Sequence, residues 1–190
     1  MNVMILNDHC ARNTTELNLL KGLCDGIVAP HEIQWVDAHE LEVQPCQKCK
    51  KCHPFGECIL TEDDAHRIGR LLFATDALVV GLSGDTPNLT ATCHALLERC
   101  RSALAYMDRN GEIRPWRKNR PAAVATLGGA TPARPSSDRE PLPSALSNIL
   151  NAGGFQLVGM VQEGAEQDPT VIAQAQNLGR VLSERMYFTV

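Results

Sequence analysis

The sequence predicts an α/β domain with a doubly wound, five-stranded parallel sheet. Short apolar segments with strand character alternate along the chain with segments in which apolar residues recur at helical spacing. This alternation is typical of parallel strands joined by right-handed helical crossovers. The length of 190 residues fits one domain. We therefore expect residues 1–190 to form a single unit.

Five strands are expected, and each is a short apolar run that leads into polar loop residues. They are residues 2–7, 32–37, 77–82, 122–127 and 155–161. The third of these runs is apolar throughout, which is typical of a strand covered on both faces. It is therefore expected at the centre of the sheet.

Five helices are expected between and after these strands. Four are residues 14–23, 89–106, 142–152 and 170–186, and the fifth begins after Thr61. Acidic residues follow Thr61 directly, and a threonine followed by acids is typical of a helix N-terminus. We therefore expect Thr61 to cap this helix.

The composition argues against several classes of function. A net charge of −4 and a pI near 5.8 give no overall field that attracts a polyanion, so nucleic acid is not expected as a partner. No apolar run approaches the roughly 20 residues that span a bilayer, so no membrane association is expected. The first residues lack the features of a signal peptide, which predicts a cytoplasmic protein. In that reducing compartment, eight cysteines favour metal or redox chemistry over disulfides.

Four of the cysteines form a compact motif in a loop expected at residues 38–60. Cys46, Cys49, Cys52 and Cys58 are spaced C-x2-C-x2-C-x5-C. Three thiols separated by two residues each can wrap one face of a cubane, and the fourth reaches the remaining iron. We therefore predict a [4Fe-4S] cluster on these four residues. Zinc is the less favoured metal, because it more often binds two separated cysteine pairs.

The residues around this motif leave two readings open. Lys48, Lys50 and Lys51 lie between the cysteines, where they either offset the charge of the thiolates or are simply solvated.

The other four cysteines are dispersed, and small buried side chains are expected for them. They are Cys10, Cys24, Cys93 and Cys100, and Cys10 is a partial exception because it lies in the first loop.

Ligands of doubly wound sheets bind beyond the carboxyl ends of the strands, in the loops that follow them. Three loops qualify: residues 7–15, 83–90 and 128–138. In the first, Arg12 offers charge-assisted hydrogen bonds to a phosphate, and the side chains of Asn13, Thr14 and Thr15 add donors beside a helix N-terminus. Ordinary helix capping by Asn13 or Thr14 is the alternative, and it requires no ligand.

The cysteine motif between the second strand and the second helix, followed by Asp63-Asp64, resembles that of the iron–sulfur flavoprotein family. This family is a branch of the NADPH-dependent FMN reductase and flavodoxin-like group. The resemblance covers most of the chain and implies a flavodoxin-like sheet with strand order 2-1-3-4-5. It also implies that FMN contacts the first loop together with Ser83, Gly84, Asp85, Gly128 and Gly129.

Two positions depart from the family pattern. Asp85 stands where relatives place an aromatic ring against the flavin, and Asp8 adds a carboxylate to the first loop. Both departures predict weaker retention of FMN, because negative charge is unfavourable beside a phosphate or a reduced flavin. Among the histidines, His94 is the one selected for testing.

The resemblance implies a cytoplasmic electron-transfer oxidoreductase in which FMN exchanges one or two electrons and the cluster passes single electrons onward. Its partner would be a redox protein or a small-molecule donor or acceptor such as NAD(P)H, and the assembly a homodimer or homotetramer. Two alternatives stay open. One is an NAD(P)H-dependent FMN or quinone reductase without a functional cluster. The other is a non-enzymatic, metal-bearing sensor or interaction module on the same scaffold.

Overall fold

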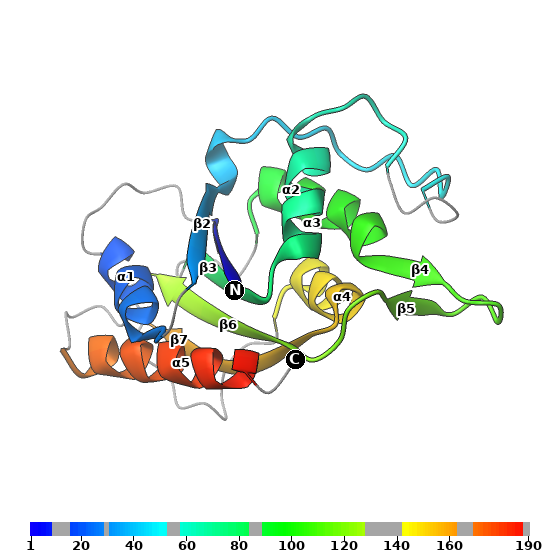
Figure 1. Cartoon of the computed structure of the whole chain (residues 1–190). Helices are drawn as coiled ribbons and strands as arrows, with labels where there is room; N and C mark the ends of the chain where they lie inside the picture. Colours follow the sequence, from blue (N-terminus) through cyan, green and yellow to red (C-terminus); the bar gives the residue numbers. More distant parts are fainter. Residues whose placement is uncertain are drawn as a thin grey trace.

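The computed structural model describes residues 1–8, 16–28, 31–52, 58–83, 89–127, 142–162 and 169–187. Its centre is a parallel sheet of five strands (Figure 1). The strands are β1 (Asn2–Asn7), β2 (Glu32–Asp37), β3 (Ala77–Ser83), β6 (Arg120–Leu127) and β7 (Phe155–Gln162). Their order is β2-β1-β3-β6-β7. Counted along the chain, this is the expected flavodoxin-like order.

The central position of β3 is confirmed. It pairs with β1 on one side, where Val79 lies opposite Ile5, and with β6 on the other, where Val79 lies opposite Ala123. Every residue of β3 before Ser83 is buried. A strand covered on both faces has no polar side to present, which is why its sequence is apolar throughout.

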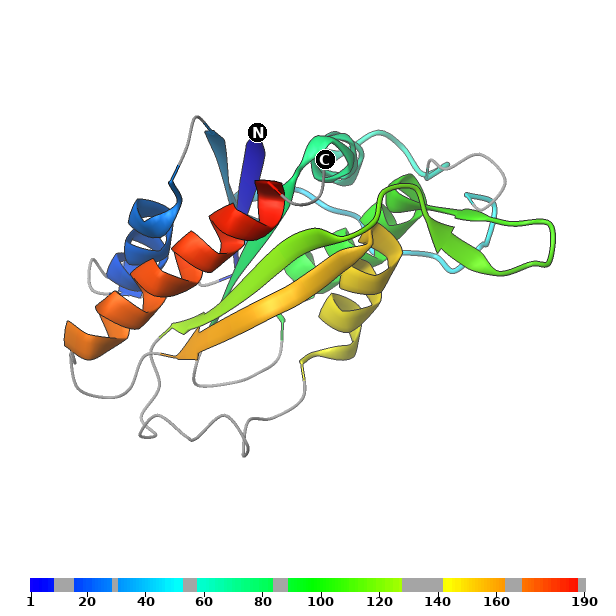
Figure 2. The same cartoon turned by 60° about the horizontal axis from the view of Figure 1, so that its bottom comes forward.

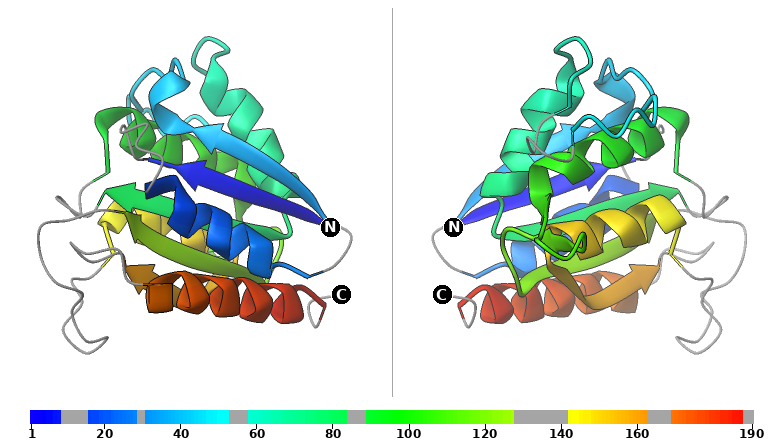
Figure 3. Two further views of the ribbon diagram at one scale, coloured as in Figure 1. Left: turned by 90° about the vertical axis from the view of Figure 1, so that its left-hand side faces the viewer. Right: turned by 90° about the vertical axis from the view of Figure 1, so that its right-hand side faces the viewer.

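Helices cover both faces of the sheet (Figure 3). One face carries α1 (Glu16–Gly26) and α5 (Pro169–Tyr187), and the other carries α2 (Asp64–Ala74), α3 (Ala91–Leu104) and α4 (Ser144–Gly153). Side chains alternate along each strand, so Val3 and Ile5 pack toward α1 and α5 while Met4 and Leu6 pack toward the other helices. None of the helices in the described ranges is both long and apolar enough to cross a membrane.

The helix boundaries differ from the prediction by a few residues, and two of these differences have a clear cause. The N-cap of α2 is Asp63, two residues after Thr61, because Asp63 accepts the backbone N–H of Ala65 at 3.0 Å and forms a capping box with His66. Helix α3 ends at Leu104, because the next three residues form a strand. These residues of β4 (Ala105–Met107) pair with β5 (Ile113–Pro115).

The β4–β5 hairpin was not predicted. It extends away from the main sheet (Figure 2) and has three residues in each strand. Strands this short carry too few positions for an alternating pattern to show. The rings of Tyr106 and Trp116 pack at a centroid distance of 4.4 Å beside it, and Gly111 supplies a positive φ of 78° in its turn. A short 3-10 helix, η1 (Ala38–Glu40), also follows β2.

A buried arginine joins the ends of two helices at the amino edge of the sheet. Arg120 donates to the carbonyl oxygens of Leu72 at 2.8 Å and Thr75 at 2.7 Å, at the end of α2, and to that of Gly153 at 3.0 Å, at the end of α4. Its guanidinium lies 3.9 Å from the ring centroid of Phe155. Burial lowers the pKa of Arg120 to about 10, yet the carbonyl dipoles give the cation full hydrogen bonding.

Candidate functional site

The carboxyl edge of the sheet is the first candidate site. The crossover from β1 to β2 uses α1 on one face of the sheet, whereas the crossover from β2 to β3 uses α2 on the opposite face. The strand order therefore switches between β1 and β3, and this is the position at which doubly wound sheets bind ligands. The ends of the two strands are tied together, because the backbone N–H of Asp8 donates to the carbonyl oxygen of Gly81 at 2.9 Å.

Most of the predicted flavin contacts lie outside the described residues. These are Arg12, Asn13, Thr14, Thr15, Gly84, Asp85, Gly128 and Gly129. Ser83 is described: it is the last residue of β3 and pairs with Leu127 at the end of β6. All nine assignments stay predictions.

Asp8 has a structural role at this edge that its sequence position did not predict. Its carboxylate is buried and accepts both the backbone N–H of Thr90 at 2.8 Å and the Thr90 hydroxyl. Thr90 is the N-cap of α3, and its Oγ1 in turn accepts the backbone N–H of Cys93 at 3.2 Å. Asp8 thus ties the end of β1 to the start of α3, where the helix dipole favours a negative charge.

The cysteine segment is the second candidate site, and its Cys52 lies within electrostatic reach of Cys46 and Cys58. Burial raises the pKa of Cys52, a hydrogen bond with Ser102 opposes this rise, and the charges of Cys58 and Cys46 add to it. Cys46, Cys52 and Cys58 are partly buried, whereas Cys49 is exposed. Across the described ranges, no group of three or more histidine, cysteine, aspartate or glutamate side chains is arranged to hold a metal ion. The assignment of the four cysteines as ligands therefore stays a prediction.

The backbone of this segment adopts an unusual conformation between the cysteines. Lys48 and Lys50 have φ angles of 53° and 59°, in the left-handed region that costs a non-glycine residue about 1 to 2 kcal/mol. The backbone N–H of Lys48 donates to Sγ of Cys46 at 3.4 Å. Turns that alternate in this way form concave sets of N–H groups that bind anions and iron–sulfur clusters.

Four side chains hold the cysteine segment at both ends, and we call Asp63, Asp64, His66 and Arg99 the loop clamp. At the near end, Asp63 Oδ2 accepts the backbone N–H of Gln44 at 2.9 Å and Asp64 Oδ2 accepts that of Glu42 at 2.9 Å. At the far end, His66 Nε2 lies 2.9 Å from the carbonyl oxygen of Cys58. His66 Nδ1 accepts the backbone N–H of Asp63 at 3.3 Å, which assigns the ring hydrogen to Nε2 and makes this nitrogen the donor to Cys58.

Arg99 forms the centre of the loop clamp. Its side chain is fully buried, is paired with Asp63, and donates to the carbonyl oxygen of Gln44 at 3.2 Å. Burial alone would lower the pKa of Arg99, but Asp63 and Cys58 raise it above its ordinary value. Its Nε has no hydrogen-bond partner in the described part of the chain. The loop clamp thus places a permanent positive charge beside Cys58.

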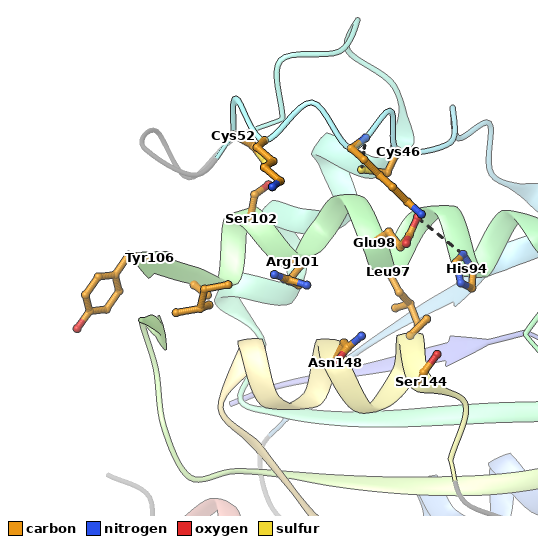
Figure 4. A pocket seen from close by; sticks show the side chains of 15 residues that line it. Cys46, Cys52, His94, Leu97, Glu98, Arg101, Ser102, Tyr106, Ser144 and Asn148 are labelled. Atoms are coloured by element: carbon orange, nitrogen blue, oxygen red, sulfur yellow. Dashed lines mark hydrogen bonds and ion pairs between the residues drawn. The ribbon is translucent and has the colours of Figure 1, made fainter. Parts of the chain in front are cut away.

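A cavity of about 350 Å³ lies between the cysteine segment, α3, α4 and the hairpin (Figure 4). Its polar lining comes from each of these parts: Cys46, Lys48, Lys50, Cys52, His94, Glu98, Arg101, Ser102, Tyr106, Ser144 and Asn148. Nδ1 of His94 and Oε2 of Glu98 are 3.9 Å apart across one turn of α3. Cys49 is not among the lining residues.

Sequence reasoning missed most of this cavity. Arg101 and Ser102 were not singled out, because a lone arginine or serine on a helix gives no functional signal without knowledge of what faces it. The adjacent acids Asp63 and Asp64 were noted only as part of a resemblance. Only the fold shows that Asp63 meets Arg99 at one end of the cysteine segment.

No protein-family model matches the chain, and no curated protein matches it by sequence. Solved structures do share its fold. An FMN-dependent NADH-azoreductase from Bacillus anthracis, in complex with FMN, superposes with a TM-score of 0.66 and 14% identity over 98% of both chains. An NAD(P)H:quinone oxidoreductase from Methanothermobacter marburgensis superposes with a TM-score of 0.64 and 16% identity, over 96% of this chain and 98% of the other. Smu.1420 from Streptococcus mutans superposes with a TM-score of 0.69 and 12% identity, over 97% of this chain and 100% of the other. At these identities the likeness establishes the flavodoxin-like fold.

Proposed function

We propose that this protein is a flavin-dependent oxidoreductase that takes electrons from NAD(P)H through FMN and delivers them to a small organic acceptor of the quinone or azo class. The observation that carries the proposal is the switch in strand order between β1 and β3, in a fold shared with an FMN-bound azoreductase and a quinone oxidoreductase. This is the NAD(P)H-dependent reductase alternative of the sequence analysis.

Two described features of the carboxyl edge support a flavin phosphate there. The Asp8 carboxylate is held by the first turn of α3 and so is balanced by donors of its own. Helix α1 begins at Glu16, directly after the segment Arg12 to Thr15. Arg12, Asn13, Thr14 and Thr15 would hold the phosphate there, and backbone groups at Ser83, Gly84, Asp85, Gly128 and Gly129 would flank the ring. When bound, FMN supplies the capacity to accept a hydride and release electrons singly or in pairs.

Flavin titration tests this proposal. The purified chain should bind FMN with quenching of flavin fluorescence and then oxidise NADH or NADPH in the presence of a quinone. Arg12→Ala and Thr14→Ala should each weaken FMN binding by about tenfold, the loss expected for one hydrogen bond to a charged group. Arg180→Gln, an exposed site on α5, is the control. Equal FMN affinity in all four proteins would show that the first loop does not hold the phosphate.

A second candidate concerns the cysteine segment, where we propose that Cys46, Cys49, Cys52 and Cys58 hold a [4Fe-4S] cluster, with zinc as the alternative metal. The cysteine spacing, the left-handed backbone at Lys48 and Lys50, and the electrostatic effect of Cys46 and Cys58 on Cys52 favour it. Arg99 beside Cys58 would offset part of the negative charge of the centre. A bound cluster would supply single-electron transfer.

Metal analysis separates the candidates. Protein purified without oxygen should contain iron and acid-labile sulfide, and each single Cys→Ser change should sharply reduce both. Flavin without iron would support the simple reductase. Metal without flavin would instead indicate a metal-bearing sensor or interaction module.

Light scattering on the same samples tests the accompanying proposal of a homodimer or homotetramer.

A further inference from the structure

The cavity beneath the cysteine segment has a local charge opposite to that of the whole protein. Lys48, Lys50 and Arg101 line it, and Glu98 is the one carboxylate among the lining residues that the structure describes. Within the described ranges, no hydrogen bond or ion pair engages the side chains of these three cationic residues. The chain as a whole carries a net charge of −4. Three unpaired cations around one cavity are complementary to an anion.

The rest of the lining suits an organic body. Leu97, Ala105 and Ile113 give an apolar wall, and Tyr106 lies at the outer end of the lining, with its ring directed away from the other lining side chains (Figure 4). Asn148 on α4 and Arg101 on α3 lie between the two helices, on the side of the cavity away from Cys46 and Cys52 (Figure 4). A volume of about 350 Å³ is at the lower end of the range for small-molecule sites.

We infer that this cavity is a binding site for a small organic anion that pairs an acidic group with a ring. The acidic group binds Arg101 and the two lysines, and the ring packs against the apolar wall. The charges favour an anion over a neutral ligand, and the apolar wall favours an organic anion over inorganic phosphate. This site does not depend on the proposed flavin chemistry, since neither Arg101 nor Tyr106 lies in the three loops of the carboxyl edge.

Calorimetry with a charged probe and its neutral counterpart tests the inference. The full chain is saturated with FMN, so that a planar probe does not occupy the predicted flavin site, and is titrated with 1-naphthalenesulfonate or the neutral 1-naphthalenesulfonamide. The sulfonate should bind at least about tenfold more tightly than the sulfonamide, and inorganic phosphate should bind more weakly than the sulfonate.

Two arginine variants locate the binding. Arg101→Gln should weaken sulfonate binding by about tenfold, whereas Arg180→Gln, which removes an exposed helical arginine from the opposite face of the sheet, should leave it unchanged. Thermal melts verify that both variants are folded. Absence of sulfonate binding, equal affinity for the sulfonamide, or equal affinity of the two arginine variants would overturn the inference.

Discussion

At the scale of single residues, the Asp63 carboxylate accepts hydrogen bonds from three separate parts of the chain. The donors are the backbone N–H groups of Gln44 and Ala65 and the guanidinium of Arg99. Burial alone would raise the pKa of Asp63, but these donors together hold it below its ordinary value of 3.8. The ionised form of Asp63 is therefore the one that stabilises the fold.

Replacing Asp63 should reveal this linkage as a function of pH. Asp63→Asn leaves Arg99 buried without its partner and should lower the free energy of unfolding by about 3 kcal/mol near pH 7. Because the folded pKa is depressed, the contribution of Asp63 is complete above 3.8 and is lost as the pH falls below it. Urea unfolding of both proteins between pH 3 and pH 7 measures the difference. A difference that stays constant down to pH 3 would contradict the linkage.

A second prediction at this scale concerns Arg120. Arg120→Met leaves the carbonyl groups of Leu72, Thr75 and Gly153 without their buried donor. The free energy of unfolding should therefore fall by about 3 kcal/mol. Arg117→Met is the matched control, because Arg117 also donates to Thr75 but is about one-third exposed. This change should lower the free energy of unfolding by only about 1 kcal/mol. Urea denaturation gives both values. Equal losses would show that burial of Arg120 has no special effect.

Single residues also show where sequence reasoning stops. Thr61, Asp63 and Asp64 can all cap a helix, and local propensity ranks them almost equally. The choice of Asp63 depends on Gln44 and Arg99, which are distant in sequence. A contact between residues 36 positions apart has no local signature, so the loop clamp could not be predicted.

At the scale of elements, strands and helices in the sheet were predictable because each carries a regular apolar pattern. All five strands and all five helices occur within a few residues of their expected ranges. Packing between elements was not predictable to the same degree. Helices α1 and α5 approach so closely that a Cβ atom on Gly26 would lie 1.9 Å from the carbonyl oxygen of Gln176, and one on Gly179 would lie 2.1 Å from that of Leu23.

This close approach predicts a strong effect of one methyl group. Gly26→Ala should force α1 away from α5 and lower the free energy of unfolding by about 2 to 3 kcal/mol. Gly111→Ala is the control. The φ of 78° at Gly111 makes alanine unfavourable, but no atom lies within 4 Å of the added methyl group. The free energy of unfolding should therefore fall by only about 1 kcal/mol. Chemical denaturation compares the two variants. An effect of Gly26→Ala no larger than that of Gly111→Ala would mean that the two helices adjust freely.

At the scale of the whole molecule, the cysteines of α3 differ in environment from the exposed Cys49. Cys93 and Cys100 are buried in the core between α3 and the sheet. Burial raises the pKa of the Cys93 thiol and brings that of Cys100 to about 12. Cys49 is exposed in the cysteine segment. The thiolate is the reactive form, so burial protects the core thiols both sterically and chemically.

Alkylation should therefore be selective. At pH 8, iodoacetamide should modify Cys93 and Cys100 only after denaturant is added, at rates that follow global unfolding. Peptide mapping by mass spectrometry with and without denaturant measures each site. Modification of either residue in the native protein at the rate of a free thiol would show that the α3 side of the core opens locally.

The same scale explains how much of the candidate site was predictable. The cysteine spacing and the position of the three loops are properties of the sequence, so both candidate sites could be named without the structure. The cavity is different, since its lining comes from the cysteine segment, α3, the hairpin and α4. The position of Arg101 in this lining becomes visible only when residues more than 40 positions apart, such as Arg101 and Asn148, are placed in space.

The loop clamp has one more consequence, for the tolerance of the chain to insertion. Its anchors on the segment are Glu42, Gln44 and Cys58, and the first three cysteines lie inside this closed span. The entropy cost of closing a span grows only logarithmically with its length, by about 0.6 kcal/mol for each doubling. Residues between the anchors can therefore be lengthened, shortened or exchanged at small cost to the sheet, which makes the segment a natural graft site for other ligand-binding sequences.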